Sequence, residues 1–241
     1  MKISEWEDSE TEKQAILDLT KKTYGDDAEI SNSSYFNWQY RNNPTGKAVV
    51  LLAHDELNNN LLVGTNTIIP VSLLVDQEKI LSSLACNVQV HPDYQKKGIF
   101  SKLLSSMHSI AKIKEISSLF GIPNENAFHS WINNGSSEII QLPLLARPIK
   151  FSRYFNSPIN KFLKIFDGHW KVKTSSLSVE EFNGNFQSFE KLIEKISKRV
   201  SIIQNRNEEY LKWRYLDHPT RQYQIYVLKQ NDELVGDIII K

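Results

Sequence analysis

One stretch of the sequence has the residue types and the spacing of an anion-binding turn. An apolar run that ends at Val90 is followed, after a short gap, by Gln-Lys-Lys-Gly at residues 95–98. Residues 99–111 then place apolar side chains at helical spacing. The first N–H groups of such a helix have no partner within it, and the helix dipole makes that end positive. With two lysines, and a glycine that allows close approach of the backbone, this helix end suits a pyrophosphate.

The rest of the chain supplies the elements that must position this turn. Apolar periodicity predicts helices, and apolar runs between polar or Gly/Pro clusters predict strands. In chain order we expect a helix over 10–24, a short helix over 35–41 capped by Ser33-Ser34, a strand over 48–53, a strand over 61–75 that is continuous or broken near Pro70, a strand over 80–90, the helix 99–111, a strand over 116–120, a helix over 124–133, a strand or hairpin over 139–149, a linker over 151–168, a helix over 186–200, and strands over 222–229 and 234–240. The turn therefore joins a strand to a helix in a chain of mixed α and β structure.

Composition and charge argue against several classes of protein. The 241 residues carry 29 Lys and Arg against 28 Asp and Glu, so no general nucleic-acid-binding surface is expected. With one cysteine, Cys86, and six histidines without metal-ligand spacing, we expect no disulfide and no metal, and Cys86 is expected to be a buried structural thiol. The acidic start lacks the apolar core of a signal peptide, and polar residues interrupt the apolar run 61–75. We therefore expect no membrane insertion and a cytoplasmic location.

A short pattern occurs twice in the chain. The shared positions are Tyr35 and Tyr210, Trp38 and Trp213, Tyr40 and Tyr215, Pro44 and Pro219, and Thr45 and Thr220, all at an offset of 175 (210 − 35). Each copy is followed by an apolar run, a polar turn and Val-Gly. We interpret this as a duplication; the alternative is a shared helix-to-strand corner without common ancestry. The second copy ends before any equivalent of residues 84–111, so chemistry that uses that element must lie in the first copy.

The stretch from Leu84 to Leu104 resembles the first motif of the GNAT acyltransferase superfamily. That motif has a Gln/Arg-x-x-Gly-x-Gly/Ala loop after a strand that ends in Val-x-Pro. Gln95 and Gly98 match the loop, and Phe100 stands where Gly or Ala is usual. Over residues 124–136 the spacing of Asn, Ala and Gly is similar to the family's next motif, with Trp131 where Tyr is usual.

By this resemblance the fold is α+β, with a mixed and mostly antiparallel sheet that is flanked by helices and splays beside the strand of the first motif. The resemblance implies a GNAT acyltransferase domain over 1–155. The internal repeat extends this to a partial second GNAT-like unit with a linker over 156–241. The implied co-substrate is acetyl-CoA or another acyl-CoA, bound without a metal.

The resemblance also implies which residues bind the acyl-CoA. The strand backbone would line the pantetheine arm and polarise the thioester carbonyl, the turn would hold the pyrophosphate, and the helix of the second motif would contact the pantetheine. The residues concerned are Val88, Gln89, Val90, Gln95, Lys96, Lys97, Gly98, Ile99, Phe100, Ser101, Asn124 and Trp131. The sequence assigns no catalytic base or acid: Trp131 cannot act as a general acid near neutral pH. The other candidates near in sequence are Glu125, His129, Glu138 and His91.

Two functions stay open at this point. The first is an N-acyltransferase, most simply an N-acetyltransferase, in which an amine of a small molecule attacks the thioester directly in a ternary complex; an amino sugar is one candidate acceptor. The second is a non-catalytic acyl-CoA-binding or scaffold protein of the same fold, which the departures at Phe100, Trp131 and Ser136 motivate.

The last predicted strand, 234–240, leaves an apolar edge in the incomplete second copy. Edge strands with unpaired N–H and C=O groups invite pairing with another chain. We expect either a homodimer through this strand or marginal stability of residues 165–241.

Overall fold

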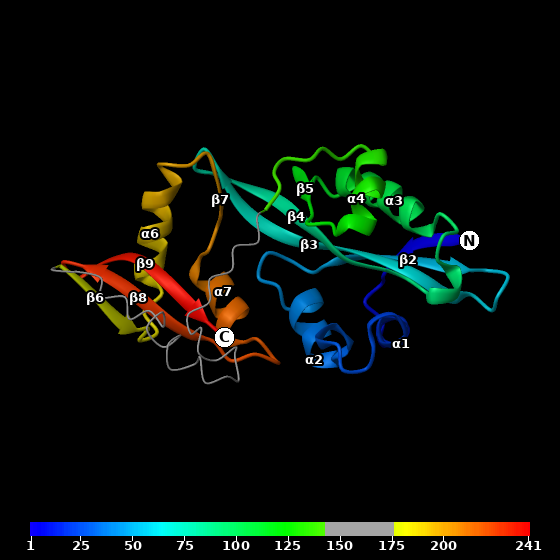
Figure 1. Cartoon of the computed structure of the whole chain (residues 1–241), viewed down its shortest axis with the longest axis horizontal. Helices are drawn as coiled ribbons and strands as arrows, with labels where there is room; N and C mark the ends of the chain where they lie inside the picture. The colour runs from blue at the N-terminus through cyan, green and yellow to red at the C-terminus, as the bar shows by residue number, and fades with distance from the viewer. Residues whose placement is uncertain (143–175) are drawn as a thin grey trace, which may run out of the picture.

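The computed structural model describes residues 1–142 and 176–241 of the chain (Figure 1). Its larger sheet has the order β1 (Lys2–Glu5), β2 (Val49–Asp55), β3 (Leu61–Val75), β4 (Glu78–Val90) and β5 (Ser118–Phe120). These neighbours are antiparallel except for β4 and β5, which are parallel. The predicted α+β fold with a mixed, mostly antiparallel sheet is confirmed.

Helices cover both faces of this sheet (Figure 1). On one face lie α1 (Glu10–Tyr24) and α2 (Ser33–Phe36), which continues as the π-helical turn η2 (Asn37–Arg41). On the other face lie α3 (Ile99–Ile113) and α4 (Glu125–Asn133). The core under α1 and α2 contains Val50 and Leu52, whereas the core under α3 contains Val49, Leu51 and Ala53. Successive strand side chains point to opposite faces, so the apolar run of β2 is buried on both.

The second part of the described chain builds a three-stranded sheet with the order β6 (Leu177–Glu181), β8 (Gln224–Gln230) and β9 (Glu233–Ile240). One apolar core joins this sheet to α6 (Gln187–Ser197) and to α7 (Glu208–Leu211), which continues as a second π-helical turn, η6 (Lys212–Leu216). β7 (Ile202–Gln204) instead pairs with β3 in the larger sheet. The second unit therefore contributes one strand, β7, to the larger sheet of the first unit.

The two units show the same order of elements around the repeated pattern. In each unit an Asn caps a short helix that passes into a π-helical turn of five residues, Asn32 before α2 and Asn207 before α7. The strand that follows is bulged after Ala53 in the first unit and after Leu228 in the second. The duplication itself stays a prediction, and the predicted boundary between residues 155 and 156 lies outside the described residues.

Several local details differ from the predicted elements. The second helix is capped by Asn32 and not by Ser33 or Ser34, because the Asn32 side chain accepts from the backbone N–H groups of the first helical turn. Residues 139–142 form no strand; the rest of the predicted 139–149 hairpin and the linker 151–168 lie outside the described residues. The short strands β1, β6 and β7 are not predicted, since runs of three to five residues carry little periodicity.

Strand β3 is continuous through Pro70, in agreement with the first of the two predicted alternatives. The stretch of β3 that pairs with β2 ends at Ile68, and the stretch that pairs with β7 begins at Leu73. The Pro70 carbonyl accepts from Asn43 Nδ2 at 2.9 Å. The nitrogen and the carbonyl of a strand residue face the same side, so the N–H that proline lacks falls between the two paired stretches and costs no ladder bond.

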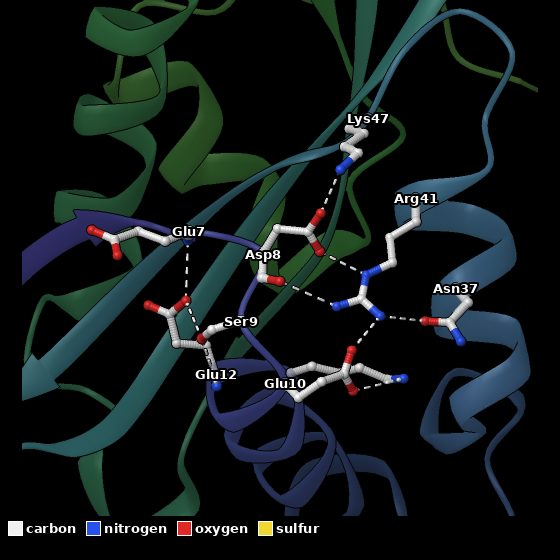
Figure 2. Close-up of polar contacts among 9 residues, drawn as sticks. Glu7, Asp8, Ser9, Glu10, Glu12, Asn37, Arg41 and Lys47 are labelled. Carbon is white, nitrogen blue, oxygen red and sulfur yellow. Dashed lines mark hydrogen bonds and ion pairs between the residues drawn. The ribbon is translucent and has the colours of Figure 1, made fainter.

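A polar cluster joins η2 to the start of α1 (Figure 2). Arg41, the last residue of η2, donates from Nε to Asp8 Oδ1 at 2.6 Å and pairs through Nη1 with Glu10 Oε1 at 2.7 Å. Lys47 donates to the other Asp8 oxygen at 2.5 Å. The hydrogen bond from Lys47, with that from Arg41, lowers the pKa of Asp8. The C-terminal end of η2 is thereby tied to the start of the first helix.

The core under α3 supports a stability prediction. Leu103 is fully buried there, at 0% exposure, whereas Leu57, in the turn between β2 and β3, is 98% exposed. We expect Leu103→Ala to lower the free energy of unfolding by about 2–5 kcal/mol, because it leaves a cavity against the sheet. Leu57→Ala should change it by less than about 0.5 kcal/mol. Urea unfolding followed by circular dichroism measures both, and equal effects would contradict the described packing of α3.

Candidate functional site

The predicted anion-binding turn lies between the end of β4 and the start of α3. A helical turn, η3 (Pro92–Tyr94), comes first, and Gly98 is the N-cap of α3 with a φ of +75°. A Cβ at Gly98 would meet no atom within 4 Å. Glycine suits this left-handed position, and the space beside it is open. Because Lys96 and Lys97 are exposed on the same turn, the N-terminal end of a 15-residue helix carries two exposed cations.

Tyr94 anchors this turn to the hairpin between β2 and β3. Its hydroxyl donates to Asp55 Oδ2 at 2.8 Å and accepts from Asn58 Nδ2 at 3.0 Å. The Lys97 ammonium lies over the Tyr94 ring, 4.5 Å from its centre. The hydrogen bond from Tyr94 is the largest cause that lowers the pKa of Asp55. These contacts within the protein therefore orient both the turn and the ammonium group of Lys97.

Strand β4 carries a β-bulge shortly before the turn. The register of β3 against β4 shifts between Thr65 and Thr67, and Asn87 in β4 has a φ of +51°. Asn adopts this left-handed conformation more readily than most residues. A bulge bends its strand and re-aims backbone groups, so the peptide groups after Asn87 leave the regular ladder.

Residues of η2 hold this bulge. Asn87 Nδ2 donates to Gln39 Oε1 at 3.0 Å and to Tyr40 Oη at 3.1 Å. Thr67 Oγ1 donates to the same Tyr40 oxygen at 3.2 Å. Burial raises the pKa of Tyr40, so its hydroxyl stays protonated. The first π-helical turn thus fixes the bulge through two adjacent side chains.

β4 loses one of its neighbours before the bulge. β5 pairs with β4 only over Ser82–Leu84, and in the described parts of the chain no other strand pairs with this side of β4 over 85–90. Trp131 of α4 lies where the strands separate, since a Cβ at Gly121 would come within 2.7 Å of the Trp131 ring and 3.2 Å of the Ala85 carbonyl oxygen. The predicted splay beside the strand of the first motif is therefore present.

The predicted site residues fall mostly along this edge and turn. The backbone of Val88–Val90 forms the open part of β4, and the stretch from Gln95 to Ser101 contains the turn and the first residues of α3. The Val88 carbonyl accepts from the Tyr24 hydroxyl at 3.0 Å. Gln89 turns its side chain to α1, where Nε2 donates to Thr20 Oγ1 at 2.9 Å. The Gln89 side chain is therefore engaged with α1. Its carbonyl oxygen lies on the β3 side of β4, 3.2 Å from where a Cβ of Gly64 would stand.

Four other predicted residues have structural contacts of their own. Ile99 is buried and Phe100 is half-buried, both in the core under α3. Asn124 is the N-cap of α4, and its Oδ1 accepts from the backbone N–H of Ala127 at 3.0 Å. Trp131 is buried against the same core. These contacts neither exclude nor assign a role toward acyl-CoA, so the cofactor-binding roles stay predictions.

The sequence did not predict the side chains that hold the site in place. Asn87 carries a local signal, because Asn inside an apolar strand is typical of a bulge. Tyr94 and Asp55 lie 39 residues apart, and no local pattern connects them. The aromatic hydroxyls of Tyr24 and Tyr40 likewise reach β4 from elements much earlier in the chain.

The candidates for a catalytic base differ in their surroundings. Glu125, His129 and Glu138 are exposed. His91 is buried, and its Nδ1 accepts from the backbone N–H of Asp93 at 3.3 Å. None of these contacts assigns a base. In residues 1–142 and 176–241, no group of three His, Cys, Asp or Glu side chains could hold a metal ion.

A hollow of about 620 Å³ lies elsewhere, between the two units. Its lining includes Trp38 and Asn42 of the first unit with Trp213 and Asp217 of the second, and no residue of β4 or of the turn 95–101.

None of the helices in the described ranges is both long enough and apolar enough to span a bilayer.

A sheet that splays beside a bulged strand, followed by a glycine turn and a helix N-terminus, defines a fold of the GNAT acyltransferase class. The sequence model of a protein family described as acetyltransferase (GNAT) domain matches residues 7–130, just over half of the chain. The chain belongs to this family. The resemblance seen in the two motifs is thereby confirmed, as is the prediction of an acyltransferase at the level of the family.

Solved structures of similar fold cover both units. A protein of Enterococcus faecalis described as a probable N-acyltransferase aligns with 99% of this chain at a TM-score of 0.64 and 10% identity. N-myristoyltransferase of Saccharomyces cerevisiae with bound myristoyl-CoA aligns with 98% at a TM-score of 0.59 and 15% identity. The chain spans 55% and 59%, respectively, of those two chains. A search of curated proteins finds no match.

The single cysteine allows a direct test of the site's packing. Cys86, expected to be buried, is half-buried: it packs against the core under α1 and α2, and this burial raises the pKa of its thiol to about 12. At pH 8 its thiolate fraction is then more than about 1,000-fold below that of an ordinary cysteine. We expect iodoacetamide at pH 8 to modify the folded protein at least 100-fold more slowly than the protein in urea, as read by intact mass. Rapid modification of the folded protein would contradict this packing.

Proposed function

We propose that the chain is an N-acyltransferase that moves an acyl group from acyl-CoA, with acetyl-CoA as the first donor to test, to an amine of a small molecule. The observation that carries this proposal is the open N-terminal end of α3, directly after a bulged strand that is paired on one side only. Family membership supports the reaction class. The similar yeast structure contains myristoyl-CoA, which supports an acyl-CoA as the co-substrate.

Acyl-CoA fits the residues that the turn provides. The backbone N–H groups of residues 99–101 have no partner within the helix and would hold the diphosphate. The exposed ammonium groups of Lys96 and Lys97 add charge there, and the absent Cβ of Gly98 leaves room for it. Those peptide groups of residues 88–90 that face the unpaired side of β4 would pair with the amides of the pantetheine arm.

In the proposed reaction the amine nitrogen attacks the thioester carbonyl carbon directly. A C–N bond forms, the C–S bond breaks, the amine gives up a proton, and the CoA thiolate leaves and takes one up. Backbone N–H groups beside the Asn87 bulge would stabilise the charge that develops on the carbonyl oxygen. The chain then contributes binding, orientation and this electrostatic stabilisation. An amino sugar remains one candidate acceptor.

We assign the acyltransferase domain to residues 1–155 and a partial second GNAT-like unit to residues 156–241. The matching Asn caps, π-helical turns and strand bulges of the two units support this division. The cytoplasmic location and the lack of a nucleic-acid partner stay predictions.

Isothermal titration with acetyl-CoA and with desulfo-CoA tests the site. Gly98→Glu puts a side chain and a negative charge where the diphosphate would lie, and we expect binding to weaken by at least about 100-fold, or 2.7 kcal/mol. Gly184→Glu is the matched control, because Gly184 also has a positive φ (+92°) and open space but lies in the second unit. The control should bind as the unaltered protein does.

The same titration separates the two functions. Binding that Gly98→Glu removes, followed by CoA release with an amine from a panel, is the result expected of an enzyme. Binding without transfer to any amine would favour a non-catalytic acyl-CoA-binding or scaffold protein. An unaltered protein that binds neither ligand contradicts both.

We also propose a homodimer through β9. This strand forms one edge of the three-stranded sheet, and its Ile238 and Ile240 are 65% and 48% exposed. Sedimentation equilibrium should show a dimer that Ile238→Lys dissociates, because the charge would be buried at the apolar pairing edge. A monomer at every concentration tested would contradict the dimer.

A further inference from the structure

The two units meet through a reciprocal pair of tryptophans. Trp38 of η2 and Trp213 of η6 stack with ring centres 4.6 Å apart and 14° between their planes. Trp38 Nε1 donates to the Trp213 carbonyl at 2.8 Å, and Trp213 Nε1 donates to the Trp38 carbonyl at 2.9 Å. The last carbonyl groups of a helix have no partner within it. Each indole therefore caps the π-helical turn of the other unit.

Contacts at two further places keep the units in register. β7 extends the larger sheet at Leu73–Val75, and the backbone N–H of Asp76 donates to the Ser201 carbonyl at 2.7 Å. Arg221 of the second unit donates from Nε to Glu29 Oε1 of the first at 2.7 Å. The second unit thus contacts the first at separate places, at the far end of β3 and at Glu29, just before α2.

The turn η2 connects this interface to the β4 bulge. Its five residues include Trp38, which meets the second unit, and the adjacent pair Gln39 and Tyr40, which hold Asn87. At its end Arg41 is fixed by the cluster of Figure 2. Because these three residues are consecutive in one helical turn, a displacement of Trp38 would also displace Gln39 and Tyr40, and with them the bulge.

We propose that the second unit positions the acyl-CoA site of the first, and that Trp213 is the positioning residue. By stacking on Trp38 and capping its carbonyl, Trp213 fixes η2. Through Gln39 and Tyr40, η2 then fixes the bulge after which residues 88–90 face the acyl-CoA. The effect on acyl-CoA rests on the proposed function, whereas the mechanical link from Trp213 to Asn87 is testable without ligand.

Hydrogen–deuterium exchange of the full chain, read by mass spectrometry, tests this link. We expect Trp213→Ala to speed amide exchange in peptides covering 84–91 by at least about fivefold, because it removes a hydrogen bond and leaves a carbonyl without a partner. Peptides covering 103–113 in α3 are the internal reference and should be unchanged. Trp213→Phe keeps an aromatic ring but loses the N–H donor, so it should give a smaller increase.

Lys195→Ala is the matched control, because it removes only an exposed ion pair with Glu233 inside the second unit. It should leave the exchange of 84–91 as it is. Faster exchange confined to 33–37 and 207–223 in the Trp213 variants, with 84–91 unchanged, would overturn the proposal. Should Trp213→Ala fail to fold by circular dichroism, Trp213→Phe decides by the same criterion.

Titration with acetyl-CoA keeps this proposal distinct from the proposed function. We expect Trp213→Ala to bind several-fold more weakly than the unaltered protein, and the control variant to bind equally well. An unaltered protein that does not bind acetyl-CoA overturns the proposed function, while the exchange of 84–91 still decides whether Trp213 positions the bulge.

Discussion

Strand β4 has to bury side chains on both faces of a sheet and still present backbone groups along one side. Its pairing with β3 continues to Val90, whereas its pairing with β5 ends at Leu84. The Asn87 bulge lies within the stretch that is paired on one side, and η2 holds it from the opposite face to α3. Helices α1 and α3 pack on this strand and η2 fixes its bulge, so the site depends on how β4 is paired and held.

The charge at the site is local. With a formal net charge of +1, the chain as a whole does not attract a polyanion. The electrostatic attraction for a diphosphate must therefore come from the N-terminal end of α3 and the adjacent lysines. The anchoring of the turn by Tyr94 and Asp55 reduces the ordering that binding would require. Such a preorganised site can bind an anion without a strongly basic surface around it.

The parts of the structure that sequence reasoning could predict are those with a local signal. The glycine turn before α3 and the helical period after it show directly in the residues, and the Trp and Tyr pattern indicates that one unit recurs. That the copies touch each other is not visible, because the stack joins residues 175 apart. Asn32, Ser33 and Ser34 are all residue types that cap helices. Which of them is the N-cap depends on where the backbone becomes helical, and the sequence does not show that position. The contacts that hold the site were missed for the same reason, since each joins distant segments.

A nuclear magnetic resonance titration of the full chain, labelled with ¹⁵N, with acetyl-CoA would locate the binding site directly. We predict that the largest amide shifts fall on residues 96–101 and 88–90, at the N-terminal end of α3 and along the open side of β4. Shifts centred on the hollow beside Trp38 and Trp213, with those amides unmoved, would contradict this prediction.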